Sequence, residues 1–180
     1  MSVELKLDRP LSRRDLVRLG LAAGIAPAFR WLPAAPSFTF AHFSDTHVAL
    51  SRNVEECRAL LLEMARDVRP ELAINGGDVV DYGWPGEYDN YARAVAGLPF
   101  PLHHVPGNHD VRWAPRGLQI FRERVGEPFR SFAHRGCRFV LLDSTVPLSH
   151  YGHFESGELR WLEGELRRAG GRTPGFVVTH

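Results

Sequence analysis

Four short apolar segments of this chain each end in polar residues of types that bind metal ions. Segments 38–43, 72–74, 101–105 and 175–179 are followed by Asp45-Thr46-His47, Gly76-Gly77-Asp78, Gly107-Asn108-His109-Asp110 and His180. The carboxyl ends of parallel strands converge on one crevice of an α/β sheet, so we expect these four sites to meet in space. This arrangement constrains the fold more strongly than any other feature of the sequence.

The segments between the apolar runs have the periodicity of amphipathic helices. Residues 54–68 carry Val54, Cys57, Leu61, Met64 and Val68 at helical spacing. Further helices are predicted at 87–96, 118–124 and 156–169, and a hairpin-like pair of strands at 131–134 and 137–142. Strands alternating with helices predict an α/β domain with mostly parallel pairing.

The four polar tails would gather two aspartates, an asparagine and two or three histidines at one sheet edge. Carboxylates brought together without a partner are costly to bury. A divalent cation would remove that cost. The sequence therefore predicts a metal site at this edge of the sheet.

The motifs Asp-x-His, Gly-Asp, Gly-Asn-His-Asp and a strand-final His, in this order, resemble the pattern of the calcineurin-like metallophosphoesterases. The resemblance covers residues 38–180. It implies an α/β fold in which two packed β-sheets are flanked by helices, with the site at their shared edge. It also implies an enzyme that hydrolyses a phosphomonoester or phosphodiester through a hydroxide activated by two metal ions.

The resemblance implies a role for each polar residue. The five expected metal ligands are Asp45 and His47 for one ion, Asp78 bridging both, and Asn108 and His180 for the other. His109 would face the leaving-group oxygen, and Asp110 would orient its imidazole. Carboxylate, imidazole and amide ligands favour two Mn, Fe or Zn ions.

Two local features narrow the subgroup. Purple acid phosphatases have a tyrosine three residues after the bridging aspartate, whereas Asp81 stands there in this chain and Tyr82 comes one position later. Residues 77–83 and 105–110 instead look like those of class III cyclic-nucleotide phosphodiesterases. A nucleotide-binding module of Rossmann type is disfavoured because no glycine-rich fingerprint follows the first strand.

The N-terminal segment resembles a twin-arginine signal peptide. It contains Ser12-Arg13-Arg14-Asp15, then a weakly apolar run over 16–28 that ends in small residues. We therefore expect residues 1–36 to be a targeting segment and spacer, residues 37–180 to be the enzyme domain, and the twin-arginine translocation machinery to export the protein to the periplasm or beyond. A short amphipathic helix with two surface arginines is the alternative.

The overall charge and hydrophobicity indicate neither a nucleic-acid partner nor a membrane span, and the state of the two cysteines stays open. The net charge of +1 gives no indication of nucleic-acid binding, and no stretch is apolar enough for an ordinary membrane span. Cys57 and Cys137 could pair in an oxidising compartment or remain as two free thiols.

The pattern of the resembled family extends beyond His180, the last residue here. Its members continue into further strands and a Gly-His-x-His motif that gives each metal one more histidine. We expect this chain to be a C-terminally truncated part of such a domain, either a fragment or a natural short form. The competing function is that of a non-catalytic, exported remnant that binds metal or phosphate.

Overall fold

The computed structural model describes residues 37–170 and 173–180. The expected targeting segment, residues 1–36, lies outside these residues and remains a prediction. Residues 38–180 belong to one compact unit.

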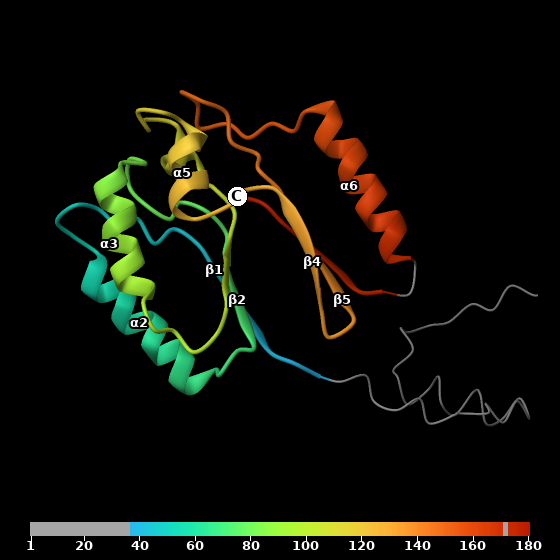
Figure 1. The fold of residues 1–180 in the computed structure, drawn as a ribbon, viewed down its shortest axis with the longest axis horizontal. Helices are drawn as coiled ribbons and strands as arrows, with labels where there is room; N and C mark the ends of the chain where they lie inside the picture. Colours follow the sequence, from blue (N-terminus) through green and yellow to red (C-terminus); the bar gives the residue numbers. More distant parts are fainter. Residues whose placement is uncertain (1–36, 171–172) are drawn as a thin grey trace, which may run out of the picture. The chain divides into compact units, whose positions relative to one another are not determined.

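The first sheet carries the expected metal-binding loops at its carboxyl edge. Its strands lie parallel in the order β1-β2-β3 (Figure 1), and they span Phe40–Phe43, Leu72–Asn75 and Leu102–His104. All four residues of β2 are buried, as expected for the central strand of a covered sheet. Helices α2 (Val54–Asp67) and α3 (Pro85–Val95) connect the strands and lie on one side of the sheet with α5 (Leu118–Arg124). Their contacts form a core around Leu61, Tyr88 and Phe121.

The second sheet follows in the chain and contains β4 (Arg130–His134), β5 (Cys137–Leu141) and β6 (Gly175–Val178). Strands β4 and β5 form an antiparallel hairpin, and β6 pairs with β5 in parallel. Helix α6 (Ser156–Ala169) connects β5 to β6 and lies on the opposite side of the sheets from α2 and α3 (Figure 1).

The two sheets pack against each other through aromatic rings. The ring of Phe139 in β5 is 5.2 Å from that of Phe40 in β1 and 4.9 Å from that of Phe176 in β6, measured between centroids. Ile74 of β2 belongs to the same buried cluster. The predicted α/β fold, with two packed sheets and flanking helices, is confirmed.

The structure differs from the sequence-based expectation in one detail and settles an open alternative in another. A short helix, α4 (Asn108–Val111), follows β3 where only a loop was expected. The Asp110 carboxylate accepts the Gly107 N–H at 2.8 Å, which supports the start of this turn. Cys57 and Cys137 are both free thiols.

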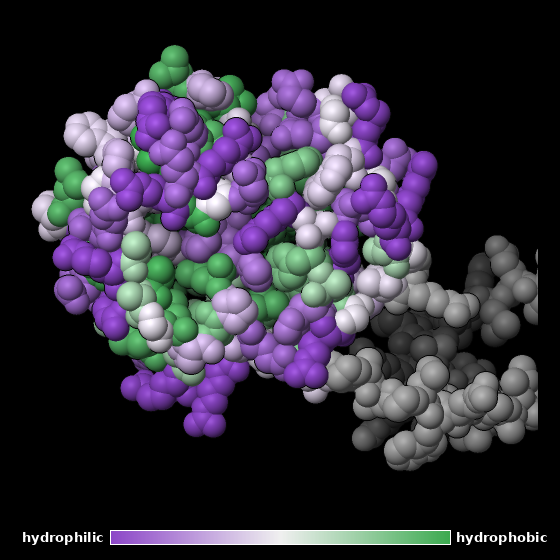
Figure 2. All heavy atoms as spheres, viewed as in Figure 1, coloured by the Kyte–Doolittle hydropathy of each residue, from purple (hydrophilic) through white to green (hydrophobic). Residues whose placement is uncertain are grey.

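The surface of the described residues is mixed. On the face shown in Figure 2, hydrophilic residues predominate and hydrophobic residues gather in smaller areas among them. Within the part of the chain that the structure describes, no helix has both the length and the hydrophobicity to cross a membrane.

Asp110 joins the loop after β2 to helix α4. Its carboxylate is fully buried and accepts the backbone N–H groups of Val79 and Val80, each at 3.1 Å, as well as that of Gly107. The Tyr88 hydroxyl lies 3.2 Å from the same carboxylate. Burial raises the pKa of Asp110 to about 7, although the three N–H groups oppose this shift. The carboxylate is therefore part of the framework that holds the two loops together.

Replacing Asp110 by alanine should destabilise the fold, because three buried N–H groups would lose their acceptor. We expect Asp110→Ala to lower the free energy of unfolding by about 3 kcal/mol or more, measured by urea denaturation. Asp110→Asn, which retains one acceptor oxygen, should lie between this variant and the wild type. Asp89→Ala is the control, because Asp89 forms only an exposed ion pair with Arg124 and should cost less than about 1 kcal/mol. Equal losses for Asp110→Ala and Asp89→Ala would contradict the assigned role.

Candidate metal centre

The loops that follow β1 and β2 are joined by backbone hydrogen bonds. The N–H of Asp45 donates to the Gly77 carbonyl at 2.9 Å, and the N–H of His47 donates to the Asp78 carbonyl at 3.1 Å. The two segments end in a parallel bridge between Val48 and Val80. This pairing places Asp45 and His47 beside Asp78.

Three of the expected metal ligands have left-handed backbone conformations. The φ angles are 59° at Asp45, 41° at His47 and 51° at Asp78. Few non-glycine residues adopt such angles, although Asp and His do so more readily than most. Each strained residue costs on the order of 1–3 kcal/mol, and such residues cluster at functional sites. Among the described residues, seven non-glycine residues have a positive φ, and three of them are residues that the sequence pattern assigns to the metals.

Two glycines allow the loops to approach each other. A Cβ atom on Gly107 would lie 2.1 Å from Oδ1 of Asp78, so no side chain fits at that position. Gly77 has a φ of 113°, and a Cβ atom there would lie 2.5 Å from Nδ1 of His180. Glycine is therefore required at both positions by the close packing around the Asp78 and His180 side chains.

Asp78 lies at the centre of the site and is 4% exposed. Its Oδ2 is 3.6 Å from Nε2 of His47 and 3.4 Å from Nε2 of His180. Its Oδ1 accepts the backbone N–H of His109 at 2.9 Å. Asp45 lies at the rim, with Oδ1 3.7 Å from Nε2 of His47. Residues from all four polar tails thus lie in or beside one cluster.

The pKa values of the central pair shift toward the charged forms. Burial alone would raise the pKa of Asp78, but the His180 side chain and the His109 N–H outweigh it, and the pKa is lowered. The hydrogen bond to Asp78 raises the pKa of His180 to about 9, despite the opposing effect of burial. Both pKa shifts arise in part because the charged Asp78 carboxylate and the protonated His180 ring stabilise each other.

The orientation of His180 fits a metal ligand. Its Nδ1 lies 2.9 Å from the Gly76 carbonyl oxygen, which can only accept a hydrogen bond, so Nδ1 carries a proton. In the neutral ring, the Nε2 lone pair then faces the carboxylate of Asp78. Metal-binding histidines typically donate their other N–H to a carbonyl or carboxylate in this way.

The spacing of the donor atoms also fits bound cations. Ligand atoms of Asp45, Asp78 and His180 all lie within 4.8 Å of one another, and those of His47, Asp81 and His109 form a second such group, so the donors are grouped differently from the two expected ligand sets. The carboxylate and imidazole donors suit divalent ions such as Mn, Fe or Zn.

The structure does not bring every expected ligand into direct contact with Asp78. Asn108, the first residue of α4, directs its amide nitrogen toward Nδ1 of His150 at 3.2 Å. It lies next to His109, whose N–H contacts Asp78. Its role as a ligand remains a prediction.

The expectation that Asp110 orients the His109 ring is wrong. The hydrogen bonds of the Asp110 carboxylate are those to backbone N–H groups and Tyr88 described above, and Nδ1 of His109 instead lies 2.8 Å from the backbone carbonyl of Asp81. The buried Asp81 carboxylate lies 3.7 Å from that nitrogen and 3.3 Å from Nδ1 of His47, and it forms an ion pair with Arg52. The Asp81 carboxylate therefore lies next to the Nδ1 atoms of both histidines.

This function of Asp81 was not predicted from the sequence. Its position served only to argue against the purple acid phosphatases, which have a tyrosine there. A carboxylate three residues after Asp78, in the same buried loop, was the available signal.

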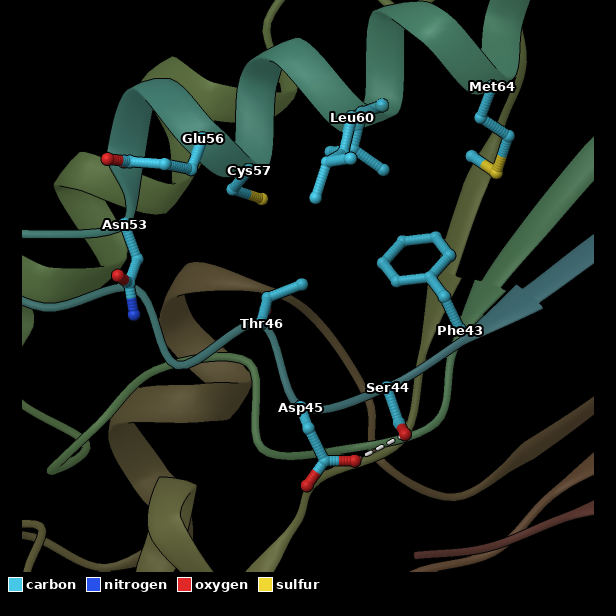
Figure 3. Close-up of a pocket in the computed structure, with 10 residues that line it drawn as sticks. Phe43, Ser44, Asp45, Thr46, Asn53, Glu56, Cys57, Leu60 and Met64 are labelled. Atoms are coloured by element: carbon cyan, nitrogen blue, oxygen red, sulfur yellow. Dashed lines mark hydrogen bonds between the residues drawn. The ribbon is translucent and has the colours of Figure 1, made fainter. Parts of the chain in front are cut away.

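A cavity of about 340 Å³ lies next to the centre, between α2 and the segment that follows β1. Figure 3 shows Leu60 and Met64 of α2 facing Phe43 and Thr46 across it, whereas the Asp45 carboxylate points away from the helix. The lining is mostly apolar, although the polar residues Ser44 and Asp45 also contribute to it.

Comparison with known proteins identifies the family. Residues 38–180 match the Calcineurin-like phosphoesterase family, and the chain belongs to it. The resemblance stated from the sequence motifs is confirmed.

Several curated proteins are similar to this chain. A "Probable cyclic nucleotide phosphodiesterase" of Rhodococcus erythropolis is 30% identical over 144 residues, which cover 73% of this chain and 48% of that protein. A "cAMP/cGMP dual specificity phosphodiesterase" of Mycobacterium tuberculosis is 30% identical over 145 residues, covering 73% of this chain and 46% of that protein. A "Glycerophosphodiester phosphodiesterase GpdQ" of Enterobacter lignolyticus is 25% identical over 154 residues, covering 78% and 55%. The chain thus spans about half the length of the curated relatives it matches.

Proposed function

We propose that this protein hydrolyses phosphodiesters by means of two divalent cations that share the Asp78 carboxylate. The observation that carries the proposal is the position of Asp78, whose Oδ2 lies 3.6 Å from His47 and 3.4 Å from His180 on two different loops. The backbone strain at Asp45, His47 and Asp78 supports it.

The chain's own residues divide into two sets of cation ligands. Asp45, His47 and Asp78 would hold one ion, and Asp78, Asn108 and His180 the other. When bound, such a pair of ions supplies a hydroxide at neutral pH and stabilises the charge on the phosphoryl oxygens. The ligands are held in place by the paired loops and by the contacts of Asp81 with His47.

His109 would act on the leaving group. Its Nδ1–H donates a hydrogen bond to the Asp81 carbonyl, so the ring is fixed and Nε2 is directed to the opposite side. Once protonated, Nε2 can donate to the oxygen of the departing alcohol. The nearby Asp81 carboxylate, 3.7 Å from Nδ1, would stabilise the positive ring.

Phosphodiesters are the favoured substrates because the relatives named above include both cyclic-nucleotide and glycerophosphodiester phosphodiesterases. Mn, Fe and Zn all fit the ligand set. Delivery by the twin-arginine translocation machinery is also part of the proposal. It rests on residues 12–28 alone, and the cell compartment in which the protein accumulates tests it.

Replacing Asp78 tests the shared ligand. The wild type should bind manganese and hydrolyse bis(p-nitrophenyl) phosphate, and Asp78→Asn should abolish hydrolysis and lower the bound metal, because one lost charge weakens both cation sites. Elemental analysis and turnover measure the two effects, and Asp89→Asn, which is remote and exposed, should behave as the wild type. Unchanged metal content and rate in Asp78→Asn would refute the site. Metal binding by the wild type without turnover would favour the alternative of a non-catalytic binding protein.

Replacing His109 tests the proton donor. His109→Ala should keep its metal content and lose roughly 10²–10⁴-fold in rate for diesters of alkyl alcohols. The loss should be much smaller for nitrophenyl esters, since nitrophenolate departs without a proton. Equal losses for the two types of leaving group would remove His109 from this role.

A further inference from the structure

Two exposed aromatic side chains lie beside the candidate catalytic histidine. We call Tyr82 and Trp113 the aromatic wall. Their ring centroids are 5.5 Å apart, and that of Trp113 is 4.9 Å from the His109 ring and 5.7 Å from that of His150. The His109 ring is in turn 4.5 Å from that of His47. A continuous row of rings thus runs from a metal ligand to the surface.

The wall is fixed to the centre by the chain itself. Tyr82 directly follows Asp81, whose carbonyl holds the His109 ring. Trp113 comes four residues after His109 and two residues beyond the end of helix α4. The Arg112 guanidinium lies 4.6 Å from the centroid of the Trp113 ring, a cation–π contact that restrains that ring.

Neither ring belongs to the two hydrophobic core clusters, and both face solvent. Tyr82 is 48% exposed and Trp113 is 39% exposed. Single exposed aromatic residues are common and need no explanation. Two adjacent ones next to a proton donor form a preorganised surface of the kind on which flat ligands stack.

We propose that the aromatic wall contacts the organic group of the substrate and favours a nucleoside over a glycerol group. This inference rests on the proposed function, because it takes His109 to lie at the leaving-group oxygen. The group attached to that oxygen must then lie near the neighbours of His109, of which Trp113 is the largest. Every nucleobase offers a flat π-face, and stacking on an aromatic side chain contributes roughly tenfold to hundredfold in affinity.

The cavity beside α2 is a second apolar surface near the centre. Leu60 and Met64 line it, but the Asp45 carboxylate points away from it (Figure 3). A phosphodiester bound at the carboxylates would therefore have its organic group on the side of His109. Of the two surfaces, the aromatic wall is the better placed to contact the organic group of the substrate.

A binding experiment tests the wall without requiring turnover. Adenosine monophosphate and glycerol 3-phosphate would be titrated by calorimetry into the manganese-loaded protein. The wild type should bind the nucleotide at least about tenfold more tightly. Trp113→Leu should lose this preference, and Trp113→Phe should recover part of it. Equal binding of the two phosphates by the wild type would overturn the inference.

A kinetic comparison separates this inference from the proposed function. The ratio of kcat/KM for 3′,5′-cyclic AMP to that for glycerophosphoethanolamine should fall about tenfold to hundredfold in Trp113→Leu, mainly through KM. Leu60→Trp, which fills the cavity beside α2, is the matched control and should leave the ratio unchanged. A selective loss of the nucleotide in Leu60→Trp rather than in Trp113→Leu would place the nucleoside in the cavity. A further outcome is that the wild type binds the nucleotide more tightly and yet hydrolyses neither substrate. That result would contradict the proposed hydrolysis of phosphodiesters but would still support the role of the aromatic wall in binding.

Discussion

The buried carboxylate of Asp78 is the group on which the site depends. Three segments far apart in the sequence contact it, through the side chains of His47 and His180 and the N–H of His109. Gly107 leaves room for it, since any Cβ atom there would overlap Oδ1. A buried negative charge in this position is costly without a cation. Bound metal would offset that cost.

The packing of the two sheets links the core to this chemistry. Phe139 and Phe176 stack on each other, and both meet the ring of Phe40 edge-on across the sheets, which fixes β6 relative to β1. Strand β6 leads directly to His180, whose ring meets the loop after β2 at Gly76. A loosened aromatic core would therefore move a metal ligand as well as weaken the fold. The position of His180 is a property of tertiary packing, although its residue type is visible in the sequence.

The sequence predicted those structural features that local residue patterns determine. Buried apolar runs predicted the strands, and helical spacing predicted α2 and α6, because these patterns follow from burial on one face. The residues Asp45, His47, Asp78 and His180 were predicted to converge because parallel strands end at one edge. The roles of Asp81 and Asp110 could not be predicted in this way. Which N–H groups and rings need a partner depends on how the loops meet. The orienting role was therefore assigned to Asp110 from the sequence, and only the tertiary geometry places Asp81 at the His109 ring instead.

We propose that two cations share Asp78. Electron paramagnetic resonance of the protein with increasing manganese per chain tests it directly, because two ions bridged by one carboxylate interact magnetically. We expect the spectrum of an exchange-coupled pair to grow in as the second equivalent binds. The six-line spectrum of isolated manganese ions at every loading would contradict it.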